Sequence, residues 1–282
     1  MGLLFLFFSC NKDDNQATYI LTPIIENTPN YKLPNIDLNN WKVTLPIGNP
    51  SSVKPPDILD YATNEMLKPY MYNDSIEGAL VFYTKPGSST PNSSYSRTEL
   101  REQMVSGSDL YNWTFKQGGN IKGRLRMDAI SNDNNGNPHR TIVMQIHGRL
   151  TNEQRDLIGQ NDNNAPPIMK ISWLDGHIRL NSKTLKNPNA QVPEILHTNA
   201  WDNDDGYTFP FKVGYQPFTL EIDAQDGKME VILNDTYKRT YTGNDMEKWG
   251  VLENYFKAGN YLSSTDKNAF ARVKYFSLKV NH

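Results

Sequence analysis

Short stretches of alternating apolar and polar residues recur along this chain, and most of them end at a glycine, a proline or an aspartate. Two pairs of such stretches flank the dipeptides Asp175-Gly176 and Asp226-Gly227. An Asp-Gly pair between two alternating stretches is a strong signal of a β-hairpin. The alternation predicts strands at residues 41–46, 79–84, 121–127, 141–147, 168–174, 177–180, 218–223, 229–233 and 271–280.

Helical patterns are weak by comparison. We expect short helices only at residues 56–67 and 244–249. Many short strands with Gly/Asp turns predict an all-β fold, a jelly-roll β-sandwich. Such folds often present a concave sheet that suits an extended polymer. The polar stretches at residues 131–138 and 151–167 are expected loops. The second ends in Pro166-Pro167 and either lies on the surface or covers part of a binding cleft.

Length and charge narrow the function. The chain has 282 residues, 29 basic and 31 acidic side chains, and a net charge of -2. A β-sandwich of this length is often one domain. The charge balance argues against nucleic-acid binding and against a polybasic membrane surface. An anionic ligand must therefore be held by a local cluster of cations.

The N-terminus carries the pattern of an export signal. An apolar run at residues 3–8 precedes Ser9-Cys10 and a polar segment, and this run is too short to span a bilayer. We expect residues 1–10 to be the remnant of a bacterial lipoprotein signal peptide with Cys10 as the lipidated residue; a truncated ordinary signal peptide is the alternative. In either case we expect a secreted protein or a lipoprotein of the outer membrane or cell surface of a bacterium. It would touch the membrane only through the lipid anchor.

The remaining organisation is simple. Residues 11–35 are polar and contain three prolines, which predicts a flexible tether, and residues 36–282 are expected to form one domain, a monomer. Cys10 is the only cysteine, so an intrachain disulfide and a cysteine-rich metal site are excluded. His139, His177 and His197 are scattered without the spacing of metal ligands. We expect no cofactor and no metal in the site; a structural calcium ion in an Asn/Asp-rich loop stays an open alternative.

Three distant segments place reactive side chains two residues apart. Side chains at i, i+2 and i+4 of a strand share one face. Arg97, Glu99 and Arg101 should therefore stand together, as should Gln145 and His147, whose intervening Ile146 would enter the core.

The third segment, if extended, places Lys257 and Tyr261 on one face across Gly259. Combined, the three segments would form a sheet surface that suits an anion with an acidic C–H bond. Taken singly, each has an ordinary explanation: a salt-bridge ladder, a hydrogen-bonded histidine and a core aromatic residue.

Together, in this order, the segments resemble the alginate lyases of polysaccharide lyase family 7. The matching motifs are Trp41-Lys42-Val43-Thr44-Leu45-Pro46, Arg97-Thr98-Glu99-Leu100-Arg101, Gln145-Ile146-His147 and Tyr255-Phe256-Lys257-Ala258-Gly259-Asn260-Tyr261. The resemblance covers residues 36–282. It implies a jelly roll whose concave sheet binds alginate, and an enzyme that cleaves this anionic polysaccharide by β-elimination.

The resemblance also implies roles for the motif residues. Elimination removes the proton on C5 of a uronate and breaks the C4–O bond, which requires donors that neutralise the carboxylate. Arg97 and Gln145 would neutralise it. His147 and Tyr261 would transfer protons, with Tyr261 alone as base and acid on mannuronate and with His147 as base on guluronate. Arg101 and Lys257 would hold neighbouring uronates. Glu99, the third residue of this substrate-binding set, would orient the arginines rather than touch the substrate.

Ile146 tilts the expected specificity toward guluronate or mixed blocks, because the family associates isoleucine at this place with such cleavage. We expect endolytic action.

Two alternatives to a lyase stay open. Glu221, Asp223 and Asp226 approximate the paired carboxylates of laminarinase-like glycoside hydrolases. A non-catalytic carbohydrate-binding module would share the fold, but it does not need Gln145, His147 and Tyr261 together.

Overall fold

The computed structural model describes residues 32–90 and 93–282. Cys10, the expected signal remnant at residues 1–10 and nearly all of the expected tether at residues 11–35 lie outside the described residues. The described residues belong to one compact unit, which holds every element below. The expected tether and domain boundary stay predictions.

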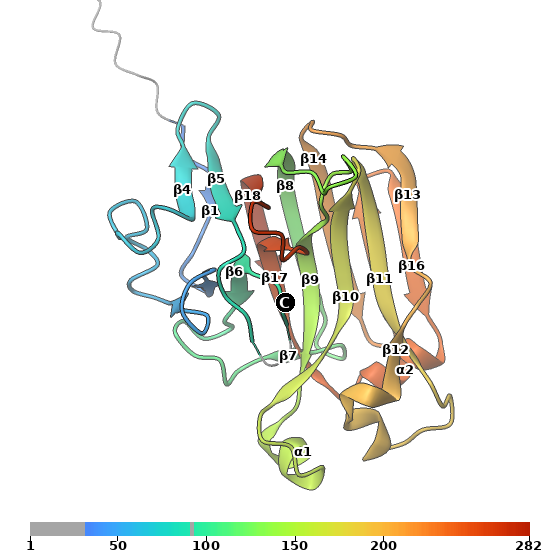
Figure 1. The fold of residues 1–282 in the computed structure, drawn as a ribbon. Helices are drawn as coiled ribbons and strands as arrows, with labels where there is room; N and C mark the ends of the chain where they lie inside the picture. Colours follow the sequence, from blue (N-terminus) through green and yellow to red (C-terminus); the bar gives the residue numbers. More distant parts are fainter. Residues whose placement is uncertain (1–31, 91–92) are drawn as a thin grey trace, which may run out of the picture. The chain divides into compact units, whose positions relative to one another are not determined.

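Two mostly antiparallel sheets make up this unit (Figure 1). The eight-stranded sheet has the order β16-β15-β14-β8-β18-β5-β4, with β1 parallel to β18. Its strands are β1 (Asn35–Ile36), β4 (Met71–Asp74), β5 (Ala79–Thr84), β8 (Gly119–Ile130), β14 (Phe218–Gln225), β15 (Lys228–Leu233), β16 (Tyr237–Thr242) and β18 (Ala271–Asn281).

The ten-stranded sheet has the order β12-β11-β10-β9-β17-β6-β2-β3, with β13 beside β11 and β7 beside β17. Its strands are β2 (Trp41–Thr44), β3 (Ser52–Val53), β6 (Arg97–Glu102), β7 (Trp113–Thr114), β9 (Thr141–Arg149), β10 (Asn164–Leu174), β11 (His177–Leu185), β12 (Trp201–Asn203), β13 (Tyr207–Lys212) and β17 (Glu253–Leu262). Neighbours such as β6 and β17 come from distant parts of the chain. The jelly-roll sandwich expected from the sequence is confirmed.

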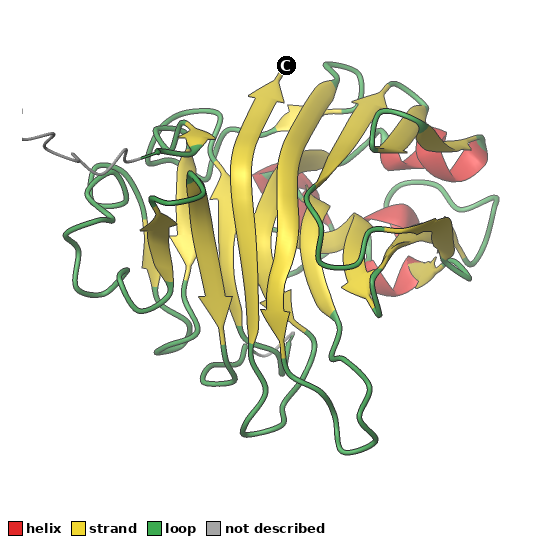
Figure 2. Ribbon diagram, turned by 90° about the horizontal axis from the view of Figure 1, so that it is seen from above, coloured by secondary structure: helices red, strands yellow, loops and turns green. Residues whose placement is uncertain are grey.

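Helices are short, as Figure 2 shows. They are α1 (Asn152–Leu157), α2 (Asn244–Trp249) and the 3₁₀ turns η1 (Glu194–Leu196) and η2 (Thr198–Ala200). The helix expected at residues 244–249 is confirmed. In the part of the chain that the structure describes, no helix combines the length and the apolar character needed to cross a bilayer.

The helix expected at residues 56–67 is wrong, because this segment is a series of turns. Its backbone bonds include Leu59 N–H to the Pro56 carbonyl at 2.9 Å and Tyr61 N–H to the Ile58 carbonyl at 3.3 Å, which span three residues rather than four. The Asn64 side chain accepts a bond from the Met66 N–H at 3.0 Å. Asn and Asp side chains that bond nearby backbone compete with helix formation, which explains the error.

The loop expected at residues 151–167 is shorter than predicted. Thr151 and Gln154 form a capping box that starts α1, and β10 already begins at Asn164. Pro166 and Pro167 therefore lie in a strand. The register between β9 and β10 shifts on both sides of Pro167, and such irregular places tolerate a residue without an N–H group.

Apolar side chains of the two sheets meet in one core. Leu100, Ile146 and Phe256 of the ten-stranded sheet are 0% exposed, as are Leu125 and Tyr275 of the eight-stranded sheet. The Tyr275 hydroxyl donates to the Val143 carbonyl and accepts from the Gly259 N–H at 3.3 Å. The core side of the ten-stranded sheet is thus fixed, and the reactive residues lie on its other side.

Candidate active site

Strand β17 lies between β9 and β6 and aligns the three motif segments. Lys257 stands beside Gln145 of β9 and Arg101 of β6. Tyr255 is opposite His147 at one end of this cluster. At the other end, Tyr261 is opposite Arg97.

The predicted alternation of side chains is confirmed on each of these strands. Ile146 and Leu100 are buried in the core, and Thr98 donates to the Tyr83 carbonyl of the opposite sheet at 2.6 Å. Their neighbours at i±1 must point away from the core. The structure therefore brings all seven predicted site residues onto one sheet face: Arg97, Glu99, Arg101, Gln145, His147, Lys257 and Tyr261.

Glu99 lies at the centre of this face, 1% exposed. Its carboxylate accepts a hydrogen bond from Gln145 Nε2 at 2.5 Å and forms an ion pair with the Lys257 ammonium. Arg97 Nη1 is 3.8 Å from Glu99 Oε2. A buried carboxylate requires such partners. Glu99 thus holds Gln145 and Lys257 in place and, more weakly, Arg97.

Gly259 makes room for this arrangement. It is the residue of β17 opposite Glu99, and its φ of +137° is one that side chains rarely adopt. A Cβ atom at Gly259 would lie 2.7 Å from the Thr98 carbonyl oxygen and 3.0 Å from Glu99 Cα. Only glycine lets β17 and β6 approach this closely.

Arg97 and Tyr261 form the second part of the cluster. The guanidinium carbon of Arg97 lies 3.9 Å from the centre of the Tyr261 ring, which is a cation–π contact. Within residues 32–90 and 93–282, the Arg97 guanidinium donates no hydrogen bond, so its fork of donors is available to a ligand. The Tyr261 hydroxyl is hydrogen-bonded to Ser93 Oγ.

His147 is held as a neutral imidazole. Its Nδ1 lies 3.0 Å from the Gly148 carbonyl oxygen, which can only accept, so Nδ1 carries the proton and Nε2 keeps a lone pair. The ring stacks on Tyr255 at 5.2 Å between centres. Burial, with the charge of Lys257 and then those of Arg97 and Arg101, lowers the pKa of His147 to about 3.

Two neighbours of His147 also have shifted proton affinities. Burial lowers the pKa of Lys257 to about 8, although the Glu99 carboxylate opposes that shift. Burial raises the pKa of Tyr255 to about 12, so this phenol stays protonated at neutral pH. Lys257 is therefore a cation that titrates close to neutrality.

The guanidinium of Arg101 is largely occupied by the protein. It donates to the Glu102 carbonyl at 2.7 Å and to Asn112 Oδ1 at 2.8 Å, and it lies 3.2 Å from Asp109 Oδ1. It also stacks over the Tyr255 ring at 4.1 Å. Arg101 thus supports the Tyr255–His147 end of the cluster, while its contact with substrate stays a prediction.

Sequence reasoning assigned no role to Ser93 or to Tyr255. The alternation around Lys257 places Tyr255 on the same face, so its position was available as a signal. Ser93 lies in an irregular segment with one isolated bridge to Thr90, and no periodic pattern marks such a contact.

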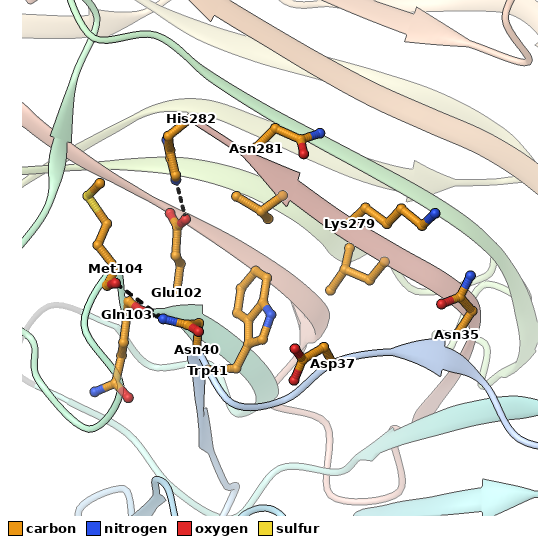
Figure 3. Close-up of a pocket in the computed structure, with 12 residues that line it drawn as sticks. Asn35, Asp37, Asn40, Trp41, Glu102, Gln103, Met104, Lys279, Asn281 and His282 are labelled. Atoms are coloured by element: carbon orange, nitrogen blue, oxygen red, sulfur yellow. Dashed lines mark hydrogen bonds and ion pairs between the residues drawn. The ribbon is translucent and has the colours of Figure 1, made fainter.

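A cavity of about 410 Å³ (Figure 3) is lined by none of the seven predicted site residues. Trp41, Glu102 and His282 are among its lining residues. Figure 3 shows His282 pointing at Glu102, and their atoms Nε2 and Oε1 are 2.6 Å apart. Glu102 Oε2 also accepts from Trp113 Nε1 at 3.1 Å and from the Phe256 N–H at 2.9 Å. The Glu102 carboxylate is thus satisfied within the protein, and we regard the cavity as structural.

The acids of the hydrolase alternative lie elsewhere. Glu221 and Asp223 are on β14 of the eight-stranded sheet, where Glu221 pairs with Lys122 at 3.0 Å. Asp226 lies beyond the end of β14, before the turn residue Gly227. These carboxylates do not share a face with His147 and Tyr261, so the structure gives the hydrolase alternative no support.

The chain is similar to several alginate lyases of known structure. Alginate lyase A1-II′ of polysaccharide lyase family 7 is 27% identical, over 88% of this chain and 96% of its own, with a TM-score of 0.68. The family 7 alginate lyase AlgAT5 is 25% identical, over 89% of this chain and 98% of its own, with a TM-score of 0.63. An alginate lyase from Pseudomonas aeruginosa shares the fold, with a TM-score of 0.65. It is 22% identical, over 87% of this chain and 99% of its own.

No curated protein sequence matches the chain. The family model described as alginate lyase matches residues 36–282, which include every residue of the cluster on β6, β9 and β17. The chain therefore belongs to the alginate lyases of polysaccharide lyase family 7.

Proposed function

We propose that this alginate lyase cleaves the polymer by β-elimination at the face formed by β6, β9 and β17, endolytically and with preference for guluronate or mixed blocks. The observation that carries the proposal is the available guanidinium of Arg97 on the same face as a neutral His147. One group binds the uronate carboxylate and the other accepts a proton. A carbohydrate-binding module has no use for that pairing.

The carboxylate of the uronate is the group to neutralise. Arg97 can donate a forked pair of hydrogen bonds to it. Gln145 uses one N–H on Glu99 and keeps the second for the substrate. Lys257 adds a positive charge nearby. Such aimed donors each contribute about 3 kcal/mol to stabilising a developing oxyanion.

Substrate binding would also strengthen the base. The cations Lys257, Arg97 and Arg101 contribute to the low pKa of His147 in the free protein. A bound carboxylate offsets their charge, so the proton affinity of Nε2 rises when the substrate arrives. On guluronate we assign His147 as the base that removes the C5 proton.

We assign Tyr261 as the acid that protonates the leaving oxygen, and on mannuronate as both base and acid. The Arg97 guanidinium lies over its ring and the Ser93 hydroxyl is hydrogen-bonded to its oxygen, so both groups position the phenol. His147 and Tyr261 stand at opposite ends of the cluster with the carboxylate donors between them. Arg97, which lies over the Tyr261 ring, also acts on His147 through its charge, so the proposed carboxylate donor lies near both groups.

Relatives support the proposal. A variant of A1-II′, 27% identical, has been solved in complex with a product (GGG). Another, 26% identical, with one histidine and one tyrosine replaced, has been solved with a substrate (GGMG). Complexes rich in G units support a guluronate preference for this chain.

The function is tested by incubating the purified protein with alginate and following the ultraviolet absorbance of unsaturated uronate ends. We expect absorbance to rise, faster on polyguluronate than on polymannuronate, with early products of many lengths. No rise on any uronate polymer would contradict the lyase assignment. Equal rates on polyguluronate and polymannuronate would contradict the guluronate preference. Release of a single short product would contradict endolytic action.

Export and lipidation form a separate proposal that rests on the sequence around Cys10. We expect mass spectrometry of the membrane-bound protein to find an acylated N-terminal Cys10, and Cys10→Ser to release the protein from the membrane. An unmodified Cys10 in an equally membrane-bound protein would contradict it. The monomeric state also stays a prediction, which size-exclusion chromatography with light scattering would check.

A further inference from the structure

Two lysines extend the ligand face beyond the catalytic cluster. Lys170 of β10 is the neighbour of Gln145 on β9, and its other neighbour is Asn181 on β11. Lys183 is two residues from Asn181 on the same strand, so it shares the face of Asn181 and Lys170. Both lysines are half-buried.

Neither ammonium group has a partner within the described residues, 32–90 and 93–282: none accepts a hydrogen bond from Lys170 or Lys183, and none forms an ion pair with either. The two carboxylates whose charge acts on Lys183 are engaged elsewhere. Asp202 pairs with Lys186 at 3.5 Å, and Asp204 accepts the Ser182 N–H at 2.9 Å.

This arrangement disfavours the charged lysines. Burial, and then the charge of Arg140, lowers the pKa of Lys170. Burial, and then the charge of Lys170 itself, lowers the pKa of Lys183. Two partly desolvated like charges without a counter-ion cost free energy, and a bound anion would offset that cost.

The opposite side of the same face differs. Lys42 of β2 is the neighbour of Arg101, and both contact Asp109: Lys42 by a hydrogen bond and Arg101 at 3.2 Å. Burial of Asp109 opposes its ionisation, but the bond from Lys42 and the charge of Arg101 lower its pKa overall. Lys42 and Arg101 are therefore paired with a carboxylate of the protein, whereas Lys170 and Lys183 have no such partner among the described residues.

We propose that Lys170 and Lys183 form a second anion subsite, which binds the carboxylate of another uronate unit of the polymer held at Arg97 and Gln145. The substrate then runs from the catalytic cluster across β10 to β11, rather than toward β2. Asn181 lies between the two lysines and can donate to a sugar hydroxyl or to the same carboxylate. This inference rests on the proposed function, since it concerns an oligo-uronate ligand.

The test measures binding of a guluronate hexamer by calorimetry to Tyr261→Phe protein, in which turnover is removed. Lys170→Met and Lys183→Met, added separately, remove a charge while keeping an unbranched side chain. We expect each to weaken binding roughly tenfold at low salt and much less at high salt, because salt screens charge pairing. Lys170→Arg keeps the charge, and its affinity should stay close to that of Tyr261→Phe alone.

Lys122→Met is the matched control. Lys122 lies on β8 of the eight-stranded sheet, and its replacement causes the same change in net charge. We expect hexamer affinity to change less than about twofold, because the long-range effect of one distant charge is largely screened. The subsite is contradicted if the affinity survives both Lys170→Met and Lys183→Met, or if Lys122→Met lowers it equally.

The ultraviolet assay on wild-type protein separates this result from the proposed function. Weaker hexamer binding in both lysine variants, without any unsaturated product from wild-type protein, would retain the subsite and reject the lyase. Elimination by wild-type protein with unchanged hexamer affinity in the variants would reject the subsite and retain the lyase.

Discussion

Single residues of the site differ in what the protein leaves free for a ligand. Glu99 binds Gln145 and Lys257, and Asp109 binds Arg101 and Lys42. Within residues 32–90 and 93–282, the Arg97 guanidinium makes only a cation–π contact and a long 3.8 Å approach to Glu99. Of the cluster cations Arg97, Arg101 and Lys257, Arg97 is held least by the buried acids and is therefore best able to bind a carboxylate.

The pH dependence of turnover should report His147 and Lys257. His147 is neutral above its pKa of about 3, so the base is available from acidic pH upward. Lys257 has a pKa of about 8, so its charge is lost as pH rises through that value. We expect kcat/KM, which reports the free enzyme, to be high between these values and to fall on the alkaline side near pH 8. Lys257→Arg should move that alkaline fall upward, because arginine does not titrate there. An unmoved alkaline fall in Lys257→Arg would exclude Lys257 as its cause.

Ser93 should position the phenol of Tyr261 rather than react. Without the Ser93 hydroxyl, the Tyr261 oxygen loses its partner on the protein, so we expect Ser93→Ala to lower kcat about tenfold with little change in KM, and Ser93→Thr to restore it. Initial rates over a range of alginate concentrations would check this. If Ser93→Ala lowers the melting temperature clearly as well as kcat, its role is structural and the positioning role is contradicted.

At the scale of secondary-structure elements, the site depends on how closely β17 approaches β6. Gly259→Ala would place a Cβ atom 2.7 Å from the Thr98 carbonyl at a φ of +137°. We expect it to lower the free energy of unfolding by about 3 kcal/mol and to separate Glu99 from Lys257. Urea unfolding with activity measurements would check both effects.

Gly136→Ala is the control for Gly259→Ala. Gly136 has a φ of +81°, but a Cβ atom added there would meet nothing within 4 Å among the described residues, so only backbone strain of about 1 kcal/mol is expected. If both alanine variants lose the same stability, the close approach at Gly259 is not what requires glycine.

The sequence predicted the strands well and their partners poorly. Alternation identified the inward Ile146 and Leu100 because each strand has one buried face. The pairing of Glu99 with Lys257 depends on the register of two strands that lie far apart in the sequence, which alternation does not specify. Local competition for backbone hydrogen bonds replaced the helix expected at residues 56–67 by turns. The place of Lys170 beside the catalytic cluster emerged only once the strand order was known.

At the scale of the whole molecule, contacts between the sheets hold the catalytic strands. Tyr275 of β18 bonds the backbone of both β9 and β17. His282, which follows β18, bonds Glu102 of β6, and Glu102 also bonds the N–H of Phe256, next to Lys257. The last strand of the eight-stranded sheet thus stabilises the strands of the site from behind.

The His282–Glu102 pair should make stability depend on pH. Burial lowers the pKa of His282, but the hydrogen bond and charge of Glu102 outweigh it and raise the pKa overall. A raised pKa in the folded state stabilises the protein below the ordinary histidine value, and this contribution is lost as pH rises through the raised value. We expect His282→Ala to cost about 1 kcal/mol at about pH 5.5 and less at about pH 9, as thermal melts at both values would show. A cost that does not change with pH would mean that the pair contributes no charge interaction.

The central claim is that elimination takes place between His147 and Tyr261, and single variants on defined substrates test it most directly. The initial rise of ultraviolet absorbance would be measured on polyguluronate and polymannuronate for wild type, His147→Ala and Tyr261→Phe, with folding checked by circular dichroism. We expect Tyr261→Phe to lose roughly 100-fold or more on both polymers. His147→Ala should lose as much on polyguluronate but clearly less on polymannuronate, where Tyr261 is both base and acid. Near wild-type rates for either folded variant on polyguluronate would contradict the account.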